Sequence, residues 1–141
     1  MGDLLQTKQD TALQSKAIHI GELLNDHRGG DVVVMDMMPL DFWTDFFIIA
    51  TVTSNTHAMG LEKHIKEFVR ENELEIMRRS RKPQHDDDEW RLLDLGGIVI
   101  HLMTEKARSF FELERLWSAA AIVYQGDKTQ TAVTAQSSKS S

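Results

Sequence analysis

The stretch WRLLDLGGIVIHLM, residues 90–103, contains two apolar runs that flank Gly96 and Gly97. Two glycines between apolar runs favour a two-residue turn, because glycine readily adopts the positive φ angles that such turns require. The stretch therefore predicts a β-hairpin with strands at residues 90–95 and 98–103.

The segments before this hairpin alternate between helix and strand patterns. Apolar residues spaced by three and four predict a first helix from about Thr11 to the Gly29-Gly30 pair. Strands are predicted at residues 31–37 and 45–51, which are β-branched or apolar runs, and a weaker one at residues 74–77. Between these strands we expect a helix that is capped by Thr53, Ser54 or Asn55. Its apolar stripe consists of Ala58, Leu61, Ile65 and Phe68.

After the hairpin we predict a last helix that begins at Thr104 or Ser109 and buries Phe110, Leu113 and Trp117. The resulting order, α-β-β-α-β-β-β-α, predicts an α/β fold in which helices flank a layered mixed sheet. The expected organisation is a flexible lead-in at residues 1–10, a domain at residues 11–122, and a disordered Ser/Thr-rich tail at residues 123–141.

Composition narrows the classes of function. The chain has 141 residues, 41% of them apolar, a net charge of −6 and no cysteine. Disulfides, thiolate metal sites and cysteine nucleophiles are therefore excluded. The negative charge disfavours nonspecific nucleic-acid binding and suits a basic protein partner. No signal peptide or membrane-spanning run is evident, so we expect a soluble, cytoplasmic protein.

Three carboxylates are candidates for catalysis. Asp36 and Asp45 lie at the ends of neighbouring predicted strands and Asp41 lies in the loop between them, where they could hold magnesium for nucleotidyl transfer. The Gly- and Ser-rich turn that would bind the phosphates is missing between residues 31 and 45. The favoured interpretation is that these residues cap strand ends, and a magnesium-dependent nucleotidyltransferase is the alternative.

Other polar clusters give weaker signals. His57 and His64 are seven residues apart, which is too far for one zinc ion on a helix, so neither a metal nor a cofactor is expected. The basic run Arg78, Arg79, Arg81 and Lys82 could contact RNA phosphates, but the acidic residues at 86–89 balance it. We therefore expect direct RNA contact to be minor.

Trp90 is the strongest candidate for an interface anchor. Side chains alternate along a strand, so Trp90, Leu92 and Asp94 share one face. By the same alternation Arg91, Leu93 and Leu95 point to the other face. Exposed tryptophans are favoured anchors of protein interfaces, while buried ones belong to the core. These residues alone leave both interpretations of Trp90 open.

Three segments together resemble the ribosomal silencing factor family, also called Iojap. They are DFFIIATVTSNTH at residues 45–57, the hairpin at residues 90–103, and RSFFELERLWSA at residues 108–119. Their order and spacing agree with the family pattern, and the resemblance covers about residues 11–120. Leu95 departs from that pattern, because the family often has an aromatic residue there.

The resemblance implies a nucleotidyltransferase-like core without the catalytic site, and therefore no enzyme activity. It implies binding to the large ribosomal subunit through ribosomal protein fourteen, which blocks joining of the small subunit and represses translation when nutrients are short. A role in large-subunit biogenesis and a possible homodimer are further expectations. The partner-binding residues carried over by position are Trp90, Leu92, Asp94 and Leu95.

Overall fold

The computed structural model describes residues 2–40, 44–80, 89–112, 115 and 118–127. A 3-10 turn at Met38–Leu40 joins the first two strands. The helices and strands, in chain order, are α1 (Gly2–Asp26), β1 (Gly30–Asp36), β2 (Phe46–Val52), α2 (Asn55–Glu71), β3 (Arg78–Ser80), β4 (Trp90–Asp94), β5 (Ile98–Thr104), α3 (Glu105–Phe111) and β6 (Ala121–Gln125).

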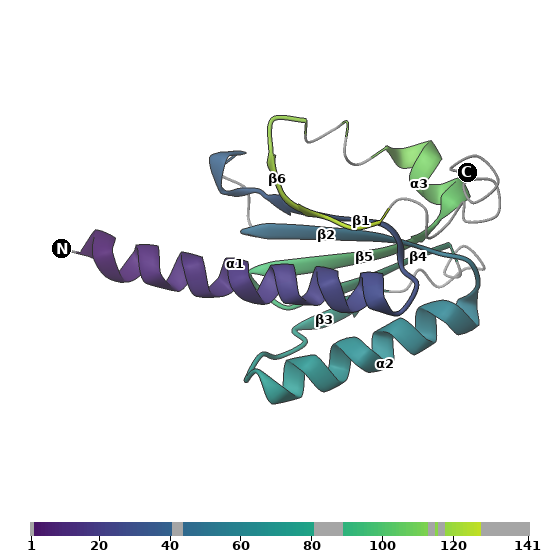
Figure 1. The fold of residues 1–141 in the computed structure, drawn as a ribbon, viewed down its shortest axis with the longest axis horizontal. Coiled ribbons are helices and arrows are strands. Elements are labelled where there is room, and N and C mark those ends of the chain that lie inside the picture. The colour runs from purple at the N-terminus through teal and green to yellow at the C-terminus, as the bar shows by residue number, and fades with distance from the viewer. Residues whose placement is uncertain (1, 41–43, 81–88, 113–114, 116–117, 128–141) are drawn as a thin grey trace, which may run out of the picture.

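The strands form one six-stranded mixed sheet in the order β3-β4-β5-β2-β1-β6 (Figure 1). Strands β2 and β5 are parallel, and all other neighbours are antiparallel. Every residue of β2 is buried, as expected of a central strand covered on both faces. The predicted α/β class with a layered mixed sheet is confirmed.

Helices cover the two faces of the sheet unequally (Figure 1). The long helices α1 and α2 cover one face and bury Ile20, Leu24 and Ile65 in the larger core cluster. The short helix α3 lies over the other face, where Met35, Phe47 and Met103 form a smaller cluster. The second face is therefore covered by fewer residues, and Trp90 and Leu92 lie at its margin, partly buried.

The predicted hairpin is confirmed. Asp94 pairs with Val99, and the N–H of Leu95 donates to the carbonyl of Ile98 over 2.8 Å. Gly96 has a φ of +92°, a conformation that side chains with a Cβ rarely adopt. The glycine pair thus sets the register that places Trp90 opposite Met103.

Several predicted boundaries are wrong. Helix α1 begins at Gly2 and not near Thr11, because no residue in this polar segment interrupts a helix that is already nucleated. The strand predicted at residues 74–77 is displaced to β3, although the N–H of Met77 already donates to the carbonyl of Asp94 over 2.7 Å.

The end of the chain differs most from prediction. Helix α3 is capped by Thr104, one of the two predicted starts, but it has only seven residues and ends at Phe111, because its C-cap Glu112 has a left-handed φ of +48°. Phe110 is consequently 79% exposed, so the prediction that it is buried is wrong. Leu113 and Trp117 lie outside the described residues. Strand β6 was not predicted, and it carries the folded chain beyond residue 122.

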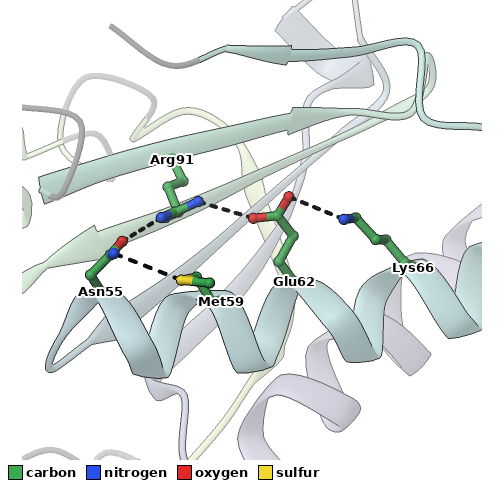
Figure 2. Close-up of polar contacts among 5 residues, drawn as sticks. All are labelled: Asn55, Met59, Glu62, Lys66 and Arg91. Atoms are coloured by element: carbon green, nitrogen blue, oxygen red, sulfur yellow. Dashed lines mark hydrogen bonds and ion pairs between the residues drawn. The ribbon is translucent and has the colours of Figure 1, made fainter. Parts of the chain in front are cut away.

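A buried ion pair joins β4 to α2 (Figure 2). The Nη1 of Arg91 donates to the Oε1 of Glu62 over 3.1 Å, and these residues are only 7% and 5% exposed. The second guanidinium nitrogen donates to Asn55, and the ammonium of Lys66 lies 3.9 Å from the other Glu62 oxygen. Arg91 thus faces α2, which turns Trp90 and Leu92 to the opposite face of the sheet.

We expect Glu62→Ala to lower the free energy of unfolding by ~3–5 kcal/mol, because it leaves the Arg91 charge buried without its partner. Lys66→Ala is the matched control: it removes the partially exposed contact to the same carboxylate and should cost ~1 kcal/mol or less. Urea unfolding of both variants measures the difference. Equal costs would show that the buried pair does not hold β4 in place.

Candidate functional site: an aromatic surface on β4 and α3

The two faces of β4 differ in burial. Arg91 and Leu93 are buried toward α2, and Trp90, Leu92 and Asp94 are half-buried on the other face. Leu95, just beyond the strand, is only 7% exposed and belongs to the core cluster beneath α1 and α2. The structure therefore brings together three of the four residues named from the sequence and places Leu95 on the opposite side.

The Trp90 side chain lies between the sheet and α3. Its Nε1 donates to the Nδ1 of His101 over 3.1 Å, so the polar edge of the indole ring points inward. The Phe111 ring lies beside the indole with a centroid distance of 4.6 Å, tilted by 52°. Trp90 is therefore neither a core residue nor a fully exposed one, because its polar edge is held while part of the ring remains at the surface.

Phe110 and Phe111 of α3 extend the apolar surface around Trp90. The sequence predicted Phe110 to be buried and gave no prediction for Phe111. Phe110 is 79% exposed and Phe111 is 37% exposed, and their rings form a T-shaped pair with centroids 5.0 Å apart. We call Trp90, Leu92, Phe110 and Phe111 the aromatic surface. Two adjacent aromatic residues on a short helix cannot both face the sheet, and this was the one sequence signal that could have indicated Phe110.

His101 supports the aromatic surface from below. The residue is 4% exposed, and burial lowers the pKa of its imidazole to about 4. Because Nδ1 accepts a hydrogen bond from the indole N–H of Trp90, the proton of the neutral imidazole resides on Nε2. Within the described part of the chain, this nitrogen is buried without a hydrogen-bond partner, and the Phe47 ring lies edge-on at 4.7 Å.

A cavity of about 380 Å³ lies on the other side of α3. Arg108, 8% exposed, donates from Nη1 to the carbonyl of Gly30 and to the hydroxyl of Thr51, the latter over 2.9 Å. Arg115 and Glu112 pair over 2.9 Å at its rim. Both acidic and basic side chains line the cavity. Arg108, the more buried of its two arginines, joins the start of β1 to the end of β2.

Two of the candidate catalytic aspartates, Asp36 and Asp45, take part in local hydrogen bonds, Asp36 through its carboxylate and Asp45 through its backbone. The Oδ1 of Asp36 accepts a hydrogen bond from the N–H of Met38 over 2.9 Å, which closes the turn after β1. The N–H of Asp45 donates to the carbonyl of Gly97 where β2 begins. Asp41 lies outside the described residues. Asp36 thus has the capping role that was the favoured interpretation.

The histidines and the basic run are placed as follows. The His27 and His64 rings stack with centroids 3.6 Å apart, a contact between the residue that follows α1 and helix α2 that spacing could not reveal. The described residues contain no group of three His, Cys, Asp or Glu side chains that could hold a metal ion. Arg78 and Arg79 lie in the edge strand β3, whereas Arg81 and Lys82 lie outside the described residues. No helix within the described ranges is long and apolar enough to cross a membrane.

Comparison with known proteins identifies the family. The model described as "Ribosomal silencing factor during starvation" matches residues 9–141. The chain belongs to the ribosomal silencing factor family. The match includes the Ser/Thr-rich tail, which the resemblance seen in the sequence had left out. The family assignment made from the three motifs is therefore confirmed.

Individual relatives agree with this assignment. The chain is 37% identical over 101 residues to the ribosomal silencing factor RsfS of Treponema pallidum, covering 70% of this chain and 86% of the relative. It is 29% identical over 123 residues to the mouse protein "mitochondrial assembly of ribosomal large subunit protein 1" and spans about half of that relative, 54%. A crystal structure of a Chromobacterium violaceum protein has a TM-score of 0.65 at 27% identity, covering 74% of this chain and 85% of that one. The names of the first two relatives concern the silencing of ribosomes and the assembly of the large ribosomal subunit.

Burial of His101 makes stability depend on pH. The imidazole pKa is lowered from 6.5 to about 4, so the stabilisation is complete above pH 6.5 and is lost as pH falls toward 4. We expect the free energy of unfolding to fall by ~2 kcal/mol between pH 7 and pH 5 from this group alone. Urea unfolding at each pH measures the slope, and His101→Leu should remove that part of it. An unchanged slope in the variant would contradict the assignment.

Proposed function

We propose that this ribosomal silencing factor binds the large ribosomal subunit through its aromatic surface and prevents the small subunit from joining. The observation that carries the proposal is the exposure of Phe110 and Phe111 beside a half-buried tryptophan. Monomeric proteins seldom leave three aromatic rings together at the surface, and such clusters supply most of the binding energy in protein interfaces.

The surroundings of the aromatic surface suit a protein partner. Asp94 lies at the end of the same strand face, and its Oδ1 accepts the N–H of Gly96 over 2.8 Å, which holds the carboxylate in one orientation. A carboxylate at the rim favours a partner with basic residues, and the chain as a whole carries a charge of −6. Ribosomal protein fourteen, the partner that the family resemblance implies, is the one we propose. Leu95 supports this strand from the core and does not contact the partner.

The proposed mechanism is steric. A stable interface covers ~800 Å² on each partner, which a domain of this size can provide with one face. A factor bound at the joining face then excludes the small subunit by occupancy, without hydrolysis or a cofactor. Translation is repressed while the factor is bound. The name of the mouse relative supports an additional role in large-subunit assembly, and the cytoplasm is the proposed site of action.

We expect Trp90→Ala and Phe110→Ala each to weaken binding to large subunits by ~2 kcal/mol or more, because both remove an aromatic anchor. Co-sedimentation with separated ribosomal subunits measures the affinity. Phe110→Ala separates binding from stability better than Trp90→Ala. The Phe110 side chain is 79% exposed, so its loss should change the free energy of unfolding little.

The matched control is Met59→Ala. Met59 is 55% exposed on α2, on the opposite face of the sheet, so its truncation should leave affinity unchanged. Wild-type affinity in both Phe110→Ala and Trp90→Ala would exclude the aromatic surface as the docking site. Failure of the wild-type protein to sediment with the large subunit would reject the proposed function itself.

The absence of catalysis is tested separately. Calorimetric titration with nucleoside triphosphates, with and without magnesium, should give no saturable binding, because Asp36 is occupied as a turn cap. Saturable magnesium-dependent heats that disappear in Asp45→Asn would instead support a nucleotidyltransferase.

A further inference from the structure

We propose that His101 is a positioning residue for docking: it holds the Trp90 indole in the one orientation that a partner can use. This inference rests on the proposed function of the aromatic surface. His101 itself is 4% exposed and therefore does not contact a partner. Its contribution to binding passes through the hydrogen bond between the Trp90 Nε1 and its own Nδ1.

The geometry makes this hydrogen bond directional. The indole has one polar atom, a donor, and here it finds an acceptor on the neighbouring strand at 3.1 Å. The two ring centroids are 5.8 Å apart, with the planes at 42°. With its edge anchored below, the indole can lie against Phe111 at 4.6 Å. The aromatic surface is thus ordered before a partner arrives, which reduces the entropy lost on binding.

The imidazole is in turn held by its surroundings. It lies edge-on to Phe47, and the residues directly opposite it on β4 and β2 are Leu92 and Ile49. All of these are uncharged. Helix α3 contributes Ala107 to the smaller core cluster on this face of the sheet, and its Arg108 side chain is directed away, to Gly30 and Thr51. No charge faces the ring from these residues, and burial keeps it neutral, with Nδ1 free to accept.

Two substitutions separate positioning from packing. His101→Asn keeps an acceptor oxygen near the position of Nδ1 but leaves a small void, whereas His101→Leu fills the volume and has no acceptor. We expect His101→Leu to be at least as stable as His101→Asn in urea. We nevertheless expect His101→Leu to bind large subunits about fivefold more weakly than wild type. The affinity of His101→Asn should stay within about twofold of the wild-type affinity.

The direct readout is the indole N–H resonance of Trp90 in ¹⁵N-labelled protein, assigned among the three tryptophans by a Trp90→Phe variant. A hydrogen-bonded, exchange-protected resonance is expected in wild type and in His101→Asn, and a shifted, rapidly exchanging one in His101→Leu. In wild type the resonance should also move as pH falls toward 4, because a protonated Nδ1 cannot accept, whereas His101→Asn should show no such titration.

The outcomes are distinct from those that test the proposed function. Wild-type affinity in a folded His101→Leu variant would overturn the positioning role while leaving large-subunit binding intact. A Trp90 resonance that is unaffected by His101→Leu and by pH would overturn it regardless of ribosome binding. Since the pH titration uses the unmodified protein, the hydrogen bond remains testable even if a variant does not fold.

Discussion

The buried ion pair between Arg91 and Glu62 determines which face of β4 is presented to solvent. A one-residue slip of this strand would exchange its two faces, moving Arg91 into solvent and Trp90 beneath α2. Burial of a guanidinium is tolerated only with a carboxylate and further acceptors in place, and Glu62 and Asn55 on α2 supply them. The ion pair therefore acts less as a source of stability than as a second constraint on the register that the Gly96-Gly97 turn sets.

From this constraint the surface follows in steps. With Arg91 directed to α2, Trp90 faces the less covered side of the sheet and meets His101 on β5. Strand β5 leads directly into α3 through the Thr104 cap, so the helix starts beside the tryptophan. Its early end at Glu112 leaves Phe110 in solvent and Phe111 against the indole. One register, one cap and one left-handed residue thus assemble the aromatic surface.

The same fold shows why architecture alone does not establish activity. Carboxylates at strand ends are compatible with metal chemistry, but Asp36 closes the turn that follows its own strand. The buried cation of α3, Arg108, joins the start of β1 to the end of β2 through its hydrogen bonds to Gly30 and Thr51. The feature to which we assign a function is the exposed aromatic surface, and the proposal that it serves association agrees with relatives named for silencing and assembling ribosomes.

Local patterns in the sequence were sufficient for the hairpin and the alternation along β4, because each depends on neighbours within a few residues. They narrowed the two helix caps to short sets of candidates that include Ser54 and Thr104, and three separate motifs together indicated the family. The location of α3's end, the exposure of Phe110 and the pairing of β6 with β1 were not predictable in this way. They depend on contacts between residues far apart in the chain, as do the stacking of His27 on His64 and the bond from Trp90 to His101. Periodicity shows which side chains share a face; only the packing of one element on another determines which face is buried.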